Sequence, residues 1–222
     1  IHEVLPALKN TNTTLAILPF GSCNDFARHL GIPKSMNEAI DCCLNGKVVE
    51  LDLGICNNGL FASVAAIGFD AEVNISVEKT RKRKRKITYL YEALKLLREY
   101  NAKAITLHGD FGTINVTAMI VACANTGSYG GGLKIAPHAL ANDGLFDICI
   151  ISQLSTIQAL NLFHRIIRGN HVNHPSVRIE KSSFLKIESN SKTRYCLDGE
   201  YSGILPVRFD IDPHAINVMV PI

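Results

Sequence analysis

The spacing of hydrophobic residues changes near Lys47. Over residues 1–46, apolar positions recur at helical spacing around one short apolar run at 15–18, which predicts the order helix, strand, helix, helix. Beyond Lys47, short alternating runs predict strands at 48–56, 60–69, 104–108, 114–124 and 145–151, and in five runs between 177 and 220. Many short strands at this spacing are typical of an antiparallel β-sandwich.

The predicted fold class is α+β, with two unlike parts. Residues 1–46 have the pattern of the end of an amino-terminal α/β domain, and residues 47–205 that of a β-sandwich domain. Residues 206–222 add closing strands whose domain assignment the pattern leaves open. Between the strands, helical spacing returns at 70–79, 87–100 and from Ser155 to Gly169. We interpret the apolar positions of the last helix as core, and an apolar groove is the alternative.

Composition indicates a folded protein without a membrane-spanning segment. Hydrophobic residues make up 47% of the chain and charged residues 19%. The longest strongly apolar run falls well short of the roughly 20 residues that cross a bilayer. The seven cysteines include no C-x-x-C pair, so we expect reduced thiols, no zinc and a cytoplasmic protein.

One strongly basic run stands out against a net charge of only +3. Arg81–Lys86 places six cations in succession. Such a run is either a solvated stretch or a contact with anionic lipid headgroups at a membrane surface. No aromatic residues alternate with the charges, so nucleic acid is not an expected partner.

The first segment with candidate chemistry is Leu18–Arg28, in which a strand turns through Gly21 into a helix. A helix start exposes unpaired backbone N–H groups and suits an anion such as phosphate, to which the Ser22 hydroxyl could donate. The alternative is that Ser22 or Asn24 caps the helix while Asp25 complements its dipole. No Gly-Lys-Ser/Thr follows, so the segment is not a P-loop.

The second segment contains three successive glycines, Gly130–Gly132, and continues into Asn142-Asp143-Gly144. Consecutive glycines permit close backbone approach to a ligand or to another strand. Asp143 and neighbouring carbonyls could supply oxygen ligands to Mg²⁺. Equally, Asn-Asp-Gly is a common turn leading into a strand.

The third segment, Cys196–Tyr201, places Asp198-Gly199 between two strand-like runs and predicts a hairpin turn. A carboxylate just beyond such a turn could accept the proton of an alcohol that attacks ATP. Spacing does not choose between Asp198 and Glu200 for this role.

Together and in this order, the three segments resemble the diacylglycerol kinase catalytic family. Pro-Phe-Gly-Ser-Cys-Asn-Asp-Phe-Ala-Arg is similar to its Pro-x-Gly-Thr-x-Asn-Asp-Phe-Ala-Arg segment. Gly-Gly-Gly-Leu-Lys-Ile-Ala-Pro, with the later Asn-Asp-Gly-Leu-Phe-Asp, resembles its mid-domain signature, and Leu-Asp-Gly-Glu its late one. The resemblance extends from Ile1 to about Gly203.

The resemblance implies roles for particular residues. Ser22 corresponds to a Thr that contacts the nucleotide, ATP, and Glu200 to the acidic proton acceptor. Asp143 and the backbone carbonyls of Leu140 and Leu145 correspond to the ligands of a bound Mg²⁺. An α/β nucleotide domain followed by a β-sandwich, the arrangement shared with NAD kinases, is implied as well.

One departure concerns the family's Gly-Gly-Asp-Gly-Thr nucleotide loop, which this chain does not contain. In relatives it immediately precedes a helix that resembles Ile1-His2-Glu3-Val4. We therefore expect the natural protein to continue upstream of Ile1, and we do not expect this chain to phosphorylate a substrate by itself.

The leading hypothesis is an ATP-dependent lipid kinase, peripheral to the membrane, that converts diacylglycerol to phosphatidic acid. A non-catalytic lipid-binding or regulatory homologue is the alternative from another class. A related kinase with another lipid or a soluble acceptor such as NAD is the third. The sequence leaves the lipid and the oligomeric state open, and a homodimer is compatible with it.

Overall fold

The computed structural model describes residues 1–21, 23–57, 59–79 and 86–222. The first 46 residues form a 3-10 turn at His2–Val4 and short helices around one strand. Their bounds are α1 Leu5–Leu8, β1 Thr14–Leu15, α2 Asp25–His29 and α3 Met36–Asn45. The remaining strands are β2 Lys47–Cys56, β3 Gly59–Phe61, β4 Val64–Gly68, β5 Lys103–Gly109, β6 Gly112–Ala124, β7 Phe146–Ser152, β8 Val177–Ser182, β9 Phe184–Ser189, β10 Arg194–Leu197, β11 Glu200–Ile204 and β12 Val207–Val220. The remaining helices are α4 Phe69–Lys79, α5 Lys86–Leu97 and α6 Thr156–Arg168.

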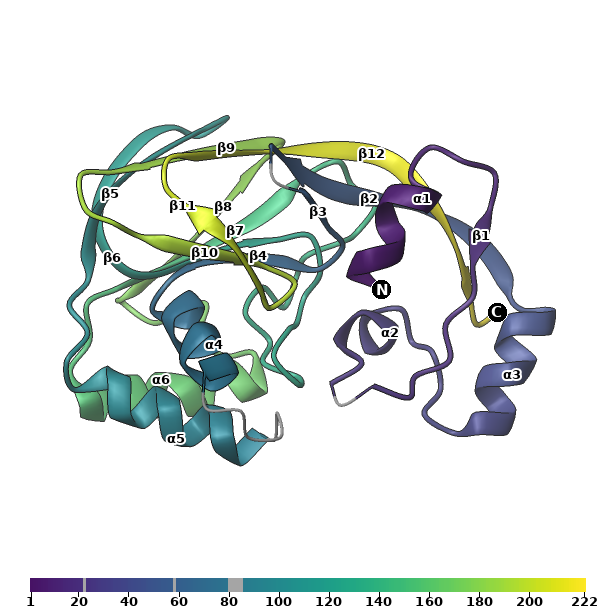
Figure 1. Cartoon of the computed structure of the whole chain (residues 1–222), viewed down its shortest axis with the longest axis horizontal. Coiled ribbons are helices and arrows are strands. Elements are labelled where there is room, and N and C mark those ends of the chain that lie inside the picture. Colours follow the sequence, from purple (N-terminus) through teal and green to yellow (C-terminus); the bar gives the residue numbers. More distant parts are fainter. Residues whose placement is uncertain (22, 58, 80–85) are drawn as a thin grey trace.

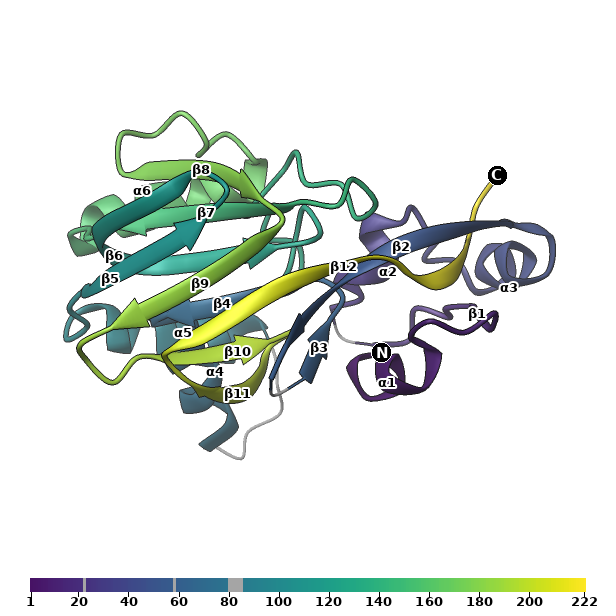
Figure 2. The ribbon, with the colours of Figure 1, turned by 90° about the horizontal axis from the view of Figure 1, so that it is seen from above.

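The strands form one continuous ladder that folds over itself into two layers (Figures 1 and 2). Along the ladder the order is β11-β10-β4-β6-β5-β9-β12-β2-β3, while β7 and β8 extend from β6. The long strand β6 links the layers, because its first half pairs with β5 and its second half with β4. The predicted α+β fold with a β-sandwich is therefore confirmed.

The core between the two layers is built from aromatic rings and aliphatic side chains. Phe61 stacks on Phe146 and meets Phe209 edge to face, with ring centroids 5.6 Å and 5.7 Å apart. Gly54 on β2 lies directly against the Phe61 ring, where a Cβ atom would overlap the ring carbons. A glycine is therefore needed at position 54, because the ring of Phe61 on the neighbouring strand occupies the space that a side chain would take.

Helices α4, α5 and α6 cover one face of the layer that contains β4, β6 and β7, which is the lower layer in Figure 1. A second cluster of buried apolar residues joins α4 and α6 to this face. It includes Val73, Val77, Met119, Leu162 and Ile166. No helix in the described ranges is long and apolar enough to cross a bilayer.

The amino-terminal elements are tied to the sandwich through the end of the chain. Strand β12 pairs with β9 near its start and with β2 along most of its length. Near its end it also pairs in parallel with β1. The predicted domain boundaries after residues 46 and 205 stay a prediction. Strand β12 pairs both with β1 of the amino-terminal part and with β2 and β9 of the sandwich.

Two strand predictions differ from the structure. The predicted strand over 60–69 is two strands, β3 and β4, which pair with different neighbours, β2 and β10. The runs predicted at 207–211 and 216–220 belong to the single strand β12. Its register shifts between Asp212 and Ile216, where His214 has a positive φ of 54°, so the alternation of side chains is interrupted without ending the strand.

The contact between Gly54 and the Phe61 ring predicts a specific mutational effect. We expect Gly54→Ala to lower the free energy of unfolding by about 1–3 kcal/mol, because the added methyl group must displace a packed ring. Urea unfolding of Gly54→Ala, Phe61→Ala and the double variant measures the coupling. The substitution at Gly54 should cost less when Phe61 is already Ala, and an equal cost in both backgrounds would contradict the proposed overlap.

Candidate active-site cleft

A cavity of about 1230 Å³ lies between the amino-terminal elements and the helices beneath the sandwich. All three sequence segments with candidate chemistry contribute to its wall. The first supplies Cys23 to Phe26, the second Tyr129 to Leu133, and the third Asp198 to Glu200. The structure therefore brings together three segments that lie far apart in the sequence.

Asp25 joins the first segment to the second. Its Oδ2 atom accepts a hydrogen bond of 2.6 Å from the backbone N–H of Gly131, while Oδ1 pairs with Arg28 on the next turn of α2. The Arg28 guanidinium also donates to the carbonyl of Cys23 at 2.7 Å. The carboxylate thus holds the glycine loop against the start of α2, in addition to complementing the helix dipole.

The three glycines form a loop that only glycine adopts without strain. Gly130, Gly131 and Gly132 have φ angles of 60°, 87° and 106°, in the left-handed region. Tyr129 and Leu133 close the loop by exchanging two backbone hydrogen bonds of 3.0 Å and 2.9 Å. The result is a stretch of backbone without side chains on the cavity wall.

Asn24 organises the turn between the first strand and α2. Its φ is 52°, and its side-chain amide donates to the carbonyls of Pro19 at 2.6 Å and Gly21 at 2.8 Å. The side chain of Asn24 makes no capping hydrogen bond to α2, so helix capping, one of the two predicted roles of this segment, does not explain Asn24. Ser22, the predicted nucleotide contact, lies outside the described residues, and its role stays a prediction.

Asp198 occupies the tip of the β10–β11 hairpin and is committed to the backbone of a neighbouring strand. Its carboxylate accepts hydrogen bonds from the N–H groups of Ala62 at 2.8 Å, Ser63 at 2.9 Å and Val64 at 3.0 Å. The same carboxylate lies 3.8 Å from Nδ1 of His2, a distance at which attraction is electrostatic, and its proximity raises the pKa of that imidazole. Asp198 therefore fixes the hairpin against β4.

Glu200 follows two residues later, at the start of β11, on the wall of the same cavity. Its side chain is exposed, and among the described residues none donates a hydrogen bond to its carboxylate. The two acids that spacing could not distinguish thus differ in their surroundings. The carboxylate of Asp198 is occupied by backbone donors, and that of Glu200 is free to accept a proton.

The predicted magnesium ligands lie around the turn before β7. The Oδ1 atom of Asp143 accepts from the N–H of Leu145 at 3.1 Å, and its Oδ2 atom from the ammonium group of Lys181 at 3.0 Å. That ammonium also lies 3.5 Å from Asp147, whose pKa is raised by burial. The third predicted ligand, Leu140, is exposed.

The arrangement of Asp143 does not fit a divalent ion as it stands. Both carboxylate oxygens already have donors, and the Lys181 ammonium supplies the positive charge that an ion would bring. In the described part of the chain, no three His, Cys, Asp or Glu side chains cluster as metal ligands. The assignment of Mg²⁺ to Leu140, Asp143 and Leu145 stays a prediction.

A half-buried acid, Asp70, lines the cavity from the first turn of α4. Its Oδ2 atom is enclosed and has no hydrogen-bond partner. Burial raises the pKa of Asp70 from 3.8 to about 6, partly offset by the hydroxyl group of Tyr129. Burial and the charge of Asp70 in turn raise the pKa of Tyr129 well above its ordinary value, so the phenol stays protonated.

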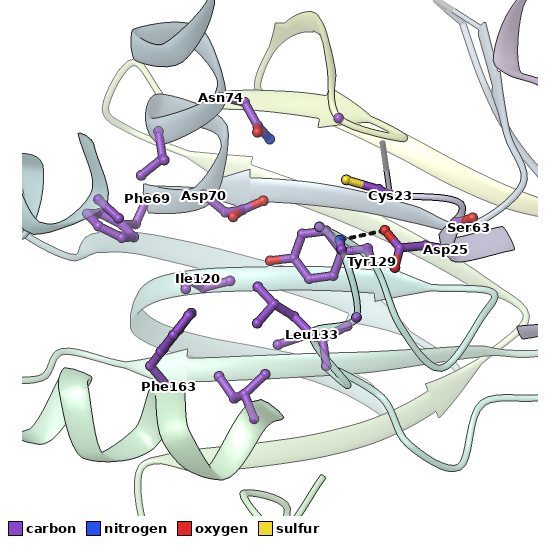
Figure 3. Close-up of a pocket in the computed structure, with 18 of the residues that line it drawn as sticks. Cys23, Asp25, Ser63, Phe69, Asp70, Asn74, Ile120, Tyr129, Leu133 and Phe163 are labelled. Atoms are coloured by element: carbon purple, nitrogen blue, oxygen red, sulfur yellow. Dashed lines mark hydrogen bonds between the residues drawn. The ribbon is translucent and has the colours of Figure 1, made fainter. Parts of the chain in front are cut away.

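The cavity is polar at one end and apolar at the other. In Figure 3, Cys23, Asp25 and Ser63 lie at one side, and Phe69, Ile120 and Phe163 at the other. Asp70 and Tyr129 lie between them (Figure 3). Helices α4, α5 and α6 supply most of the apolar wall, so part of α6 lines a cleft in addition to the core part that was predicted.

Sequence reasoning did not identify Asp70, Tyr129 or the bridging role of Asp25. Asp70 occurs in an ordinary helical pattern, and no spacing rule marks an acid that is buried only by tertiary packing. Asp52 was missed as well, although it is an acid on the inner side of a strand. Its carboxylate accepts from the backbone of Gly144 at 2.8 Å and of His214 at 2.9 Å, which holds the turn after Asp143 against β12.

Comparison with known proteins first defines the class of fold. Residues 62–220 match the family described as "YegS C-terminal NAD kinase beta sandwich-like domain", and residues 1–56 match "Diacylglycerol kinase catalytic domain". Two crystal structures from Bacillus anthracis (strain Sterne) superpose with TM-scores of 0.76 and 0.73, at 22% and 20% identity. Both alignments cover 99% of this chain, and they cover 72% and 70% of the two crystallised proteins. The second of these proteins is described as a diacylglycerol kinase.

The chain belongs to the diacylglycerol kinase catalytic family. Proteins named diacylglycerol kinase are 29% identical over 225 residues in Bacillus subtilis (strain 168) and 33% identical over 229 residues in Mycobacterium tuberculosis (strain H37Rv). Each alignment covers 100% of this chain and 74% of the relative. The predicted family is therefore confirmed.

The different surroundings of the two hairpin acids predict different effects on stability. We expect Asp198→Asn to lower the free energy of unfolding by at least about 2 kcal/mol, because an amide cannot accept from all three backbone donors. Glu200→Gln, the matched change on an exposed side chain, should stay within about 0.5 kcal/mol of the parent. Urea unfolding measures both, and equal losses would contradict the structural role of Asp198.

The raised pKa of Asp70 predicts a pH-dependent contribution to stability. Between its unfolded value of 3.8 and its folded value of about 6, the folded state binds more protons than the unfolded state. Stability from this group is therefore present at low pH and lost as the pH rises through about 6. Asp70→Asn should gain stability relative to the parent as the pH increases.

Unfolding curves recorded from about pH 5 to about pH 8 test this expectation. The difference in unfolding free energy between Asp70→Asn and the parent should grow with pH and level off above the folded pKa. A difference that does not change with pH would show that Asp70 titrates as an ordinary exposed acid.

Proposed function

We propose that the protein carrying this chain is an ATP-dependent lipid kinase that transfers the γ-phosphoryl group to a lipid hydroxyl. The observation that carries the proposal is a single cavity with an uncommitted carboxylate, Glu200, among its polar residues and a deep apolar part. Membership of the family supports a kinase, and the names of the relatives make diacylglycerol the first acceptor to test. Phosphatidic acid would be the product.

Glu200 would act as the proton acceptor. In the transfer, the acceptor oxygen forms a bond to the γ-phosphorus of ATP, the bond to the leaving oxygen breaks, and ADP departs. The hydroxyl proton passes to the Glu200 carboxylate. An exposed carboxylate without a donor among the described residues is available for this proton, whereas Asp198 already accepts three hydrogen bonds.

The phosphates of ATP would lie along the polar end of the cleft. Cys23 to Asp25 and the glycine loop 130–132 meet there through the bond from Gly131 to Asp25. Backbone without side chains, next to a helix start, allows close approach of phosphate oxygens to N–H groups. When bound, ATP supplies the phosphoryl group, and the Ser22 hydroxyl would contribute a further donor.

Magnesium accompanies phosphoryl transfer in kinases generally. We keep Mg²⁺ as a proposed cofactor of the reaction, and the proposal contains no step through Asp143. As long as Lys181 remains paired with Asp143, that carboxylate is neutralised by a side chain.

The apolar end would hold the acyl chains. Leu160 and Phe163 of α6 line the cavity and are 45% and 39% exposed. Ile157 on the same helix is 81% exposed and Tyr91 on α5 is 62% exposed. Exposed apolar residues next to a lipid cavity are suited to contact with a bilayer surface.

We propose that the protein is cytoplasmic and binds anionic membranes peripherally. The basic run Arg81–Lys86 adjoins α5, and each cation near such a surface would contribute about 1 kcal/mol. The structural placement of residues 80–85 lies outside the described ranges. Nucleic acid is not part of the proposal, and the oligomeric state, including a homodimer, does not affect it.

The role of Glu200 is tested by Glu200→Gln in the protein that carries this chain. We expect transfer of labelled phosphate from ATP to dioleoylglycerol to fall by at least about a hundredfold, because the amide cannot accept the proton. Binding of ATP should change by less than about threefold, since Glu200 is not placed among the phosphate contacts.

Asp210→Asn is the control, because Asp210 pairs with Arg208 away from the cavity. It should keep the parent activity. Undiminished transfer by Glu200→Gln would contradict the assigned role. Transfer to NAD, or no transfer to any acceptor, would instead favour a soluble-acceptor kinase or a non-catalytic homologue.

A further inference from the structure

Asp70 lines the cavity, and the proposed reaction gives it no role. It belongs neither to the glycine loop nor to the hairpin that carries Glu200. Its enclosed Oδ2 atom accepts no hydrogen bond from a described residue. An acceptor left unsatisfied in a buried position is costly, and such a group in a native structure requires an explanation.

No described cation neutralises this carboxylate. The causes that shift its pKa are burial, which raises it to about 6, and the Tyr129 hydroxyl, which lowers it. On the same helix, Glu72 is paired with Arg194 through hydrogen bonds of 2.7 Å and 2.8 Å, so the guanidinium there is already engaged. The Tyr129 hydroxyl thus serves one side of the carboxylate, and the Oδ2 atom is left without a donor among the described residues.

The surroundings of Asp70 form a small polar recess in an apolar wall. Asn74 lies one helical turn beyond Asp70 on the same face of α4, is buried and lines the cavity. Tyr129 faces Asp70 from the glycine loop, whereas Phe69 and Ile120 lie toward the apolar end (Figure 3). A lipid that spans the cavity from its polar end to its apolar end would pass this recess.

We propose that Asp70, supported by Tyr129 and Asn74, selects a lipid alcohol that carries a second hydrogen-bond donor beside its reacting hydroxyl. This inference rests on the proposed lipid-kinase function and narrows its acceptor. Diacylglycerol has a single donor, the hydroxyl that reacts, and its ester carbonyls only accept. Monoacylglycerols and N-acylated long-chain amino alcohols carry an additional hydroxyl, and the latter also an amide N–H.

Binding of three lipids to the protein that carries this chain tests the inference. The lipids are 1,2-dioleoylglycerol, 1-oleoylglycerol and an N-oleoyl long-chain amino alcohol, radiolabelled and presented in mixed detergent micelles. The last has two chains, as dioleoylglycerol does, and therefore isolates the effect of the donors from that of chain number. We expect it to bind at least about tenfold more tightly than dioleoylglycerol. Tighter binding of 1-oleoylglycerol as well would assign the recognition to a hydroxyl and not to the amide.

The variants Asp70→Leu and Asp70→Asn locate the selectivity. Asp70→Leu should reduce the preference for the donor-bearing lipids to less than about threefold, and Asp70→Asn, which keeps one acceptor oxygen, should retain part of it. The same substitutions at Asp41, an exposed acid on α3, should leave the preference unchanged. If Asp70→Leu fails to fold, the nearly isosteric Asp70→Asn still provides the comparison.

Binding separates this inference from the proposed reaction. Equal affinity of the parent for all three lipids, no binding of any of them, or a preference that survives both Asp70 variants would overturn the role of Asp70. Phosphorylation of dioleoylglycerol by a parent that binds all three lipids equally would refute the selection while leaving the kinase intact. Donor-dependent binding without phosphoryl transfer would confirm the recess and refute the kinase.

Discussion

The carboxylate of Asp198 is the interaction on which the geometry of the cleft depends. It binds three consecutive backbone N–H groups at residues 62–64 and so fixes the β10–β11 hairpin against the start of β4. Because Glu200 follows directly in that hairpin, its position on the cavity wall is set by a neighbour whose carboxylate is already occupied by backbone donors. A second carboxylate, Asp25, similarly holds the glycine loop to α2. Asp198 and Asp25 thus position the backbone around the exposed carboxylate of Glu200.

The cleft exists because two kinds of packing meet. The sandwich buries its own core between layers, and its lower face is covered by helices that leave an apolar space next to Ile151 and Leu162. The amino-terminal turn and the glycine loop close the other side with polar backbone. A substrate with both a reactive hydroxyl and a long apolar portion matches such a divided cavity.

The sequence predicted the elements better than it predicted their spatial partners. Alternation marked nearly every strand, but a period of two does not reveal that β6 and β12 each pair with different strands along their length. The segments around Asp25, Gly131 and Glu200 could be identified as candidate chemistry, because their glycines and acids also form recognisable turn patterns. Asp70 was not predictable, since its burial depends on a loop that lies about sixty residues later in the chain. The pairing of Lys181 with Asp143 was hidden for the same reason.

The central claim is that Glu200 faces the acceptor hydroxyl of a lipid held in the apolar part of the cleft. A crystal structure of the protein that carries this chain, bound to its lipid acceptor and a non-hydrolysable ATP analogue, measures this directly. The account predicts a distance of about 2.6–3.2 Å between a Glu200 carboxylate oxygen and the acceptor hydroxyl, with the acyl chain against α4 and α6. A lipid seated outside this cavity, or a hydroxyl directed away from Glu200, would contradict it.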